Sequence, residues 1–296
     1  MTEISYKDDF KSFKDEINKE RKRLFLKRFL SNKMAITGLV VLLIMILFSM
    51  FGSLFSNYGP LEMNQVDRLQ PPSSEYYFGT DTFGRDLFSR VVNGTQGSLL
   101  VGLLVTITST VIGTIVGLYA SYYRVLDHLL MRICDGLMAF PAVLLALALV
   151  AALGPKISNV IIALTIVYFP NVARIIRSSA LVVREQTYIE AMRANGASSF
   201  RIIWGHIFPN TLSPLIVQAT FIFAVAIIIE AMLSFLGAGI PAPFPSLGNI
   251  LYEAKNVLTV GWWMTLFPGF MLIMLVLSLN LFGDGLRDIL DPHKNQ

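Results

Sequence analysis

The side chains that could perform covalent, metal or nucleotide chemistry are few, and their spacing matches none of the motifs tested. A phosphate-binding loop places a lysine directly after a glycine, and none of the ten lysines has that neighbour. The three histidines, His128, His206 and His293, lack a second ligand three or four positions away, and Cys134 is the only cysteine. We therefore expect no catalytic residue, metal site or cofactor in this chain.

Two acidic residues, Asp135 and Glu230, lie well inside long apolar runs. A charge at the centre of a membrane helix costs about 2.5–3.5 kcal/mol, so such residues usually have a function. If these apolar runs form a conduit across a membrane, its energy comes either from an ion gradient, through buried carboxylates, or from a partner subunit. Two acids are too few to argue for an ion relay. The sequences of the loops are therefore needed to distinguish between the two energy sources.

The elements that position these residues are predicted to be membrane helices. Of the 296 residues, 54% are apolar and only 15% are charged, against about 25% charged in soluble domains. A span needs about 20 apolar residues, and six segments qualify. They are Met34–Phe55, Ser98–Ala120, Ile133–Leu153, Ile157–Ile176, Thr211–Leu236 and Trp262–Phe282. The third is the weakest because it contains Asp135 and Pro141. The sequence predicts an all-α, polytopic membrane protein with six transmembrane helices.

The distribution of basic residues predicts the orientation. With the N-terminus in the cytosol, the cytosolic segments hold 19 of the 24 Lys and Arg residues, so both termini are predicted to be cytosolic. Residues 1–33 form a basic cytosolic tail, which we expect to lie on anionic lipid rather than to bind nucleic acid, because acidic residues are interleaved. The apolar run that follows is too long for a secretory signal, so we expect an uncleaved anchor.

The long cytosolic loop after the fourth span is predicted to hold two short helices. The first begins at Gln186 or Thr187 and ends at Asn195-Gly196, a left-handed C-terminal signal. Ser198 can cap the second, and Pro209 ends it. An apolar stripe is expected at Phe200, Ile203, Trp204 and Ile207. Small residues at the turn would let a partner's backbone approach closely; the alternative is an amphipathic elbow that rests on the membrane.

Four separated motifs make the chain recognisable. Residues 190–209 resemble the EAA loop of permease subunits of binding-protein-dependent ABC importers, with Met192 and Phe208 at positions where the family usually has Ala and Leu. Residues 78–90, 230–237 and 280–292 resemble the C-type permeases of dipeptide and oligopeptide importers. The resemblance runs from about residue 30 to the end.

This resemblance implies a type I ABC importer permease fold, in which residues 34–296 form the six-span domain, spans two to six (about 95–284) form its core, and the loop at about 184–209 is a coupling helix. The implied partners are a second homologous permease, two cytosolic ATPase subunits that bind Mg-ATP, an external substrate-binding protein and the lipid bilayer of a bacterial plasma membrane. The expected ATPase-coupling residues are Glu190, Ala191, Met192, Arg193, Gly196, Ala197, Ser198, Ile207 and Pro209. Peptide is the leading substrate, and nickel or a metal-chelator complex is the alternative.

Two further sets of residues follow from the resemblance. Glu230 and Ser234 lie in the fifth span and are candidates for the translocation path; alternatively, Glu230 caps local backbone near the outer end. Outside the membrane, we expect Asp81, Arg85, Asp86 and Arg90 to form exposed ion pairs that order the approach to the second span; the alternative is direct contact with the external binding protein. An ion-driven secondary transporter remains a remote alternative, because it would show paired half-repeats that are not visible in this sequence.

Overall fold

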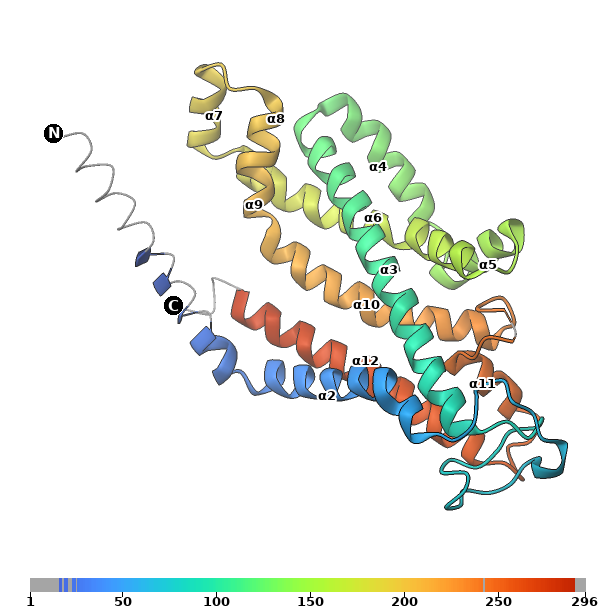
Figure 1. Ribbon diagram of the computed structural model, residues 1–296. Coiled ribbons are helices and arrows are strands. Elements are labelled where there is room, and N and C mark those ends of the chain that lie inside the picture. The colour runs from blue at the N-terminus through green and yellow to red at the C-terminus, as the bar shows by residue number, and fades with distance from the viewer. Residues whose placement is uncertain (1–15, 18, 21–22, 25, 242, 291–296) are drawn as a thin grey trace.

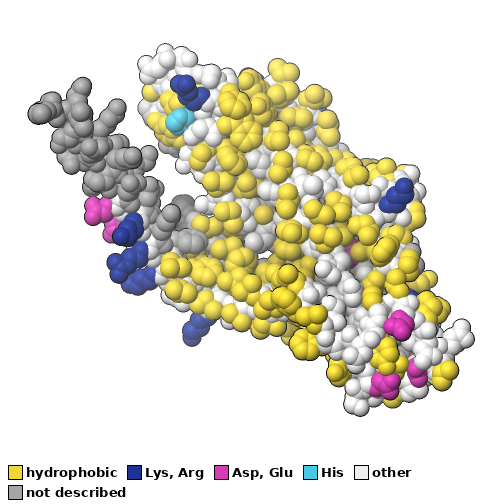
Figure 2. Space-filling model, in the orientation of Figure 1, with side chains coloured by type: hydrophobic (Ala, Val, Ile, Leu, Met, Phe, Trp, Pro, Cys, Tyr) yellow, Lys and Arg dark blue, Asp and Glu magenta, His cyan; other side chains and the backbone are white. Residues whose placement is uncertain are grey.

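The computed structural model describes residues 16–17, 19–20, 23–24, 26–241 and 243–290. Across these residues the chain is mostly helical, with loops between the helices and one isolated bridge between Thr80 and Asp86. Most of the N-terminal tail lies outside the described residues. Hydrophobic side chains cover the middle of the visible face, and charged side chains gather towards its ends, as a membrane protein requires (Figure 2).

Five helices are long and apolar enough to cross a membrane. They are α2 (Lys33–Phe51, continued by the short helix η1, Gly52–Phe55), α3 (Leu87–Tyr122), α6 (Ile157–Arg184), α10 (Leu212–Phe235) and α12 (Trp263–Leu290). All five predicted spans at these places are confirmed as helices. Three of them, α3, α6 and α12, extend beyond their apolar runs, because their polar ends remain helical.

The third predicted span is not one continuous helix. Two helices, α4 (Arg124–Met138) and α5 (Ala142–Leu153), meet at an angle of 94° and together are apolar enough for a broken sixth span or a re-entrant loop. The break falls at Pro141, which has no backbone N–H and disfavours helical geometry at the residue before it.

The two acidic residues of α4 pair with arginines of α6. Arg177 donates two hydrogen bonds to Asp127, at 2.5 and 2.6 Å, and Arg174 pairs with Asp135 at 2.8 Å. The acid that weakened the predicted third span therefore has a cationic partner on the next helix.

Two helix pairs build the fold. α3 packs along α6, and α2 lies beside α12, while α10 contacts both α3 and α12 (Figure 1). Small residues allow the close contact between α2 and α12: a Cβ added to Gly38 would lie 2.4 Å from the backbone nitrogen of Phe282. Gly285 meets the backbone of Ala35 in the same way, at 2.5 Å.

Short helices close the two ends of the bundle. On the α6–α10 side are α7 (Thr187–Ala194), α8 (Ser199–Ile202), the π-helical η3 (Ile203–Ile207) and α9 (Phe208–Asn210). At the opposite end are η2 (Gln65–Asp67) and α11 (Leu247–Ala254), with the segment that leads into α3. We call the first group the elbow (residues 187–210) and the second the cap (residues 56–86 and 237–261).

Candidate functional site

The first helix of the elbow ends as its sequence predicts. The left-handed residue is Gly196, with φ +75°, and its N–H donates to the carbonyl of Arg193 at 3.0 Å. The N–H of Ala197 reaches back to the carbonyl of Met192, also at 3.0 Å. This pattern closes the last turn of α7 and reverses the chain into α8.

The second helix differs from its prediction. Ser198 precedes α8, but its side chain makes no capping hydrogen bond. Phe200 is 68% exposed, and Ile202 takes its place on the buried face beside Ile203 and Ile207. The π-helical turn over 203–207 accommodates an additional residue, which rotates the face that an ordinary helix would bury. Pro209 lies inside α9, which continues to Asn210 instead of ending at the proline.

Buried and exposed residues divide the elbow into two faces. Four isoleucines, Ile189, Ile202, Ile203 and Ile207, have at most 1% exposure and join the same apolar core as α3, α6 and α10. The opposite face presents Glu190, Ala191, Arg193, Ala194, Gly196, Ser198 and Pro209, all exposed, while Met192 and Ala197 are half-buried. The elbow is therefore anchored on its inner face and presents an uncovered, small-residue outer face.

Two arginines, one in the elbow and one at the end of α6 just before it, contact the end of α3. The guanidinium of Arg193 lies 5.0 Å from the ring centroid of Tyr122, a cation–π contact. Arg184, at the end of α6, donates to the carbonyl of Ser121 at 2.5 Å. A displacement of the elbow would therefore act directly on the ends of α3 and α6.

The expected ion pairs of the cap are present, but the prediction that they are exposed is wrong. Asp81, Arg85 and Arg90 have 0–4% exposure. Both arginines pair with Asp81 and also with Glu253 of α11. Arg85 donates to Asp81 at 2.6 Å and to Glu253 at 2.8 Å; Arg90 bonds both acids, reaching Glu253 at 2.6 Å. These four residues form a buried ion network that ties the start of α3 to α11, over 163 positions of sequence.

The fourth predicted member, Asp86, has a different role. Its carboxylate accepts the N–H of Ser89 and the hydroxyl of Ser56, both at 2.9 Å, and so caps the N-terminus of α3. Burial raises the pKa of Asp86 above its ordinary value, against the opposing effect of these hydrogen bonds. Asp86 is a helix cap and not an ion-pair partner.

Glu230 lies at the junction of three segments. It has no exposed surface, and it accepts the hydroxyl of Ser98 on α3 at 2.8 Å and the hydroxyl of Ser234 at 2.7 Å. Ser234 in turn accepts the N–H of Ile240 at 3.1 Å. In this structure Glu230 ties α10 to α3 and, through Ser234, to the cap, and its direct role in the path stays a prediction.

We expect Glu230→Gln to keep the uptake that the family resemblance implies within about twofold, because an amide oxygen can still accept a serine hydroxyl. Glu230→Leu should instead destabilise the protein by about 2 kcal/mol, since buried hydroxyls lose their partner. Thermal unfolding of the purified transporter, with uptake measured in parallel, checks both. A Gln variant that assembles normally but does not transport would favour a direct role in the path.

Comparison with known proteins places this geometry in a family. Residues 109–296 match the family model of the binding-protein-dependent transport system inner membrane component. Residues 22–72 match the family model of the N-terminal transmembrane domain of oligopeptide transport permease C. This chain is a binding-protein-dependent ABC transporter permease. It is accordingly an integral protein of the bacterial inner membrane, and the elbow is the part of this permease that corresponds to the predicted EAA loop.

Individual relatives of this permease agree. A Brucella abortus protein that is provisionally named a peptide transport system permease is 48% identical over 99% of this chain and 98% of its own length. The dipeptide transport system permease protein of Alkalihalophilus pseudofirmus is 45% identical over 90% of this chain and 88% of its own length. The glutathione transport system permease protein of an Escherichia coli strain is 42% identical, covering 90% and 89%.

A solved structure shows the same fold. A chain of the MetNI methionine ABC transporter, crystallised in inward-facing conformations, superposes with a TM-score of 0.55 at 24% identity, and the match covers 67% of this permease and 95% of that chain. The expected importer permease fold is confirmed.

Proposed function

We propose that this permease is one of two membrane subunits of an ATP-driven importer for dipeptides and short oligopeptides. The observation that carries the proposal is the elbow, which is anchored in the core by four isoleucines and leaves its small-residue face uncovered. A face of this kind, held rigidly at the end of long helices, suits docking to a separate motor.

In this mechanism two ATPase subunits bind and hydrolyse Mg-ATP, and one of them holds α7 in a surface groove. Glu190 and Arg193 orient the contact, while Ala191, Ala194 and Gly196 allow the two backbones to approach. When the ATPases close, the elbow moves, and α3 and α6 move with it, because Arg184 and Arg193 contact the end of α3. A second, homologous permease completes the path between inward- and outward-facing states.

The orientation follows from the same assignment. Docking to a cytosolic ATPase puts the elbow in the cytosol, and six spans then put both termini there, in agreement with the distribution of basic residues. The cap faces outwards, where an external binding protein delivers substrate. The names of the dipeptide and glutathione relatives favour peptides as the substrate class.

Uptake by the assembled transporter tests the proposal. Proteoliposomes that contain both permeases, both ATPases and the external binding protein should accumulate radiolabelled alanyl-alanine only when ATP is supplied inside. Excess unlabelled tripeptide should compete, and a nickel–chelator complex should not. ATP-dependent uptake of a labelled nickel–chelator complex, with no uptake of alanyl-alanine, would overturn the substrate assignment.

A further inference from the structure

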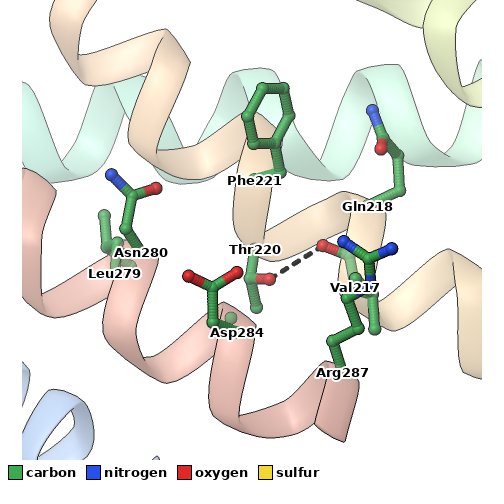
Figure 3. A pocket seen from close by; sticks show the side chains of 9 residues that line it. Val217, Gln218, Thr220, Phe221, Leu279, Asn280, Asp284 and Arg287 are labelled. Carbon is green, nitrogen blue, oxygen red and sulfur yellow. Dashed lines mark hydrogen bonds between the residues drawn. The ribbon is translucent and has the colours of Figure 1, made fainter. Parts of the chain in front are cut away.

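A second polar site lies between α10 and α12 near the elbow end of the bundle. A pocket of about 240 Å³ opens there, and Figure 3 shows Asp284 and Arg287 of α12 pointing towards α10. It is lined by Val217, Gln218, Thr220, Phe221, Leu279, Asn280, Gly283, Asp284 and Arg287. We call it the α10–α12 groove.

The groove extends into the span region. A Cβ on Gly283 would lie 2.6 Å from the hydroxyl of Thr220, so the two helices cross closely at this level. Thr220 is eight residues after the first residue of α10, which corresponds to about 12 Å along the helix. Asn280 lies inside the predicted last span, while Asp284 and Arg287 follow its end at Phe282 on the polar last turns of α12.

These groups have no partner within the described part of the chain. Among the described residues, no hydrogen bond or ion pair is made by the side chains of Gln218, Asn280, Asp284 and Arg287. The last three of these side chains are exposed. Asn280, Asp284 and Arg287 lie on one face of α12, at intervals of four and three residues. Charged groups at the polar end of a membrane helix meet water or a polar partner rather than lipid, so this face is open to a polar ligand at the elbow end of the bundle.

The chemistry of the lining matches a free peptide. Asp284 can pair with an ammonium group and Arg287 with a carboxylate, while the amides of Gln218 and Asn280 can bond a peptide unit. Phe221, 55% exposed, offers an apolar contact for a side chain. An adjoining pocket of about 420 Å³ shares Val217, Gln218 and Arg287, so the space falls within the size usual for small-molecule sites, about 300–1,000 Å³.

We propose that the α10–α12 groove is a cytosol-facing subsite that holds the cargo peptide before release, with its amino terminus at Asp284 and its carboxylate at Arg287. The proposal rests on the proposed peptide-import function. Binding is weak, with a dissociation constant on the order of millimolar, since exposed charge pairs contribute little. Weak binding suits a site from which the cargo has to leave.

Cysteine protection in the full complex tests the subsite. The reporter is Phe221→Cys in a Cys134→Ala chain, assembled with its partners and labelled from the cytosolic side by a charged methanethiosulfonate. Alanyl-alanine at 20 mM should slow labelling about fivefold, as simple competition gives for a dissociation constant of about 5 mM. Val125→Cys, at a position that is 82% exposed on α4 and outside the groove, should label at the same rate with and without peptide.

The termini are assigned by a second comparison. N-acetyl-alanyl-alanine should protect Phe221→Cys much less than alanyl-alanine does, and adding Asp284→Asn should abolish that difference. Asp288→Asn, the same charge change four residues further along α12 and outside the groove lining, should preserve it.

Two results would overturn the subsite. One is labelling of Phe221→Cys that no peptide slows; the other is a reporter that stays unlabelled while Val125→Cys reacts, which would mean that the partner permease covers the groove. Alanyl-alanine uptake by right-side-out vesicles of the same preparation separates these results from failure of the proposed function, since vesicles without uptake would contradict peptide import itself.

Discussion

Glu190→Lys and Ala191→Trp are expected to reduce ATP hydrolysis stimulated by the binding protein at least tenfold, and peptide uptake with it. Both side chains are exposed on α7, so neither change should disturb folding. A docked ATPase would meet a reversed charge in the first variant and a bulky ring in the second, and losses at the centre of an interface reach 2 kcal/mol or more, or roughly thirtyfold. Hydrolysis and uptake by purified complexes check the prediction.

The control is Val125→Trp, which places the same ring on an exposed position of α4 and should retain normal rates. Size-exclusion chromatography of each variant shows whether the permease is intact. If Glu190→Lys and Ala191→Trp both hydrolyse ATP and import peptide normally, the elbow does not transmit the motor's work.

Glu253→Gln is expected to produce the second large effect, loss of the cap. Its carboxylate bonds both Arg85 and Arg90, and without it two buried guanidinium groups share the single charge of Asp81. Removing one partner of a buried ion pair costs about 3–5 kcal/mol; Glu253 itself is 23% exposed, so the lower end applies. Thermal unfolding in detergent should show a midpoint lower by roughly 5–10 °C.

A neighbouring substitution separates the ion network from a general effect of changing the external loop. Lys255→Gln removes a charge two residues from Glu253. The Lys255 ammonium lies over the ring of Tyr252, so the unfolding midpoint of this variant should move by no more than about 2 °C. Adding Arg85→Met to Glu253→Gln should recover part of the loss, because the buried charges then balance. Equal midpoints for Glu253→Gln and the unmodified permease would show that the network is not structural.

Much of the fold could be predicted from apolar runs and turn signals alone. Five spans could be predicted from the length of the uncharged runs alone. The end of α7 could be predicted from Asn195-Gly196, because a local left-handed turn depends on its own residues. The bend at Pro141 could not be predicted, since a proline in an apolar run is compatible with a kink as well as with a right-angled break.

The charges of the cap were harder to interpret, because their burial depends on a distant residue. Asp81 and its arginines looked exposed in a polar loop, and nothing local indicates that Glu253 of α11 covers them. The elbow shows a similar limit: the π-helical turn rotates the buried face from Phe200 to Ile202, and period 3.6 alone cannot reveal it. In the groove, the face shared by Asn280, Asp284 and Arg287 is visible in the sequence, but the contribution of α10 is not.

The central claim, that this permease is moved by a separate motor through its elbow, is tested most directly by reconstituting the two permeases with and without the ATPase subunits. With the ATPases, the binding protein and internal ATP, proteoliposomes should accumulate alanyl-alanine against its gradient, and Glu190→Lys should prevent this. Uphill accumulation by the permeases alone, driven by an ion gradient, would contradict the claim.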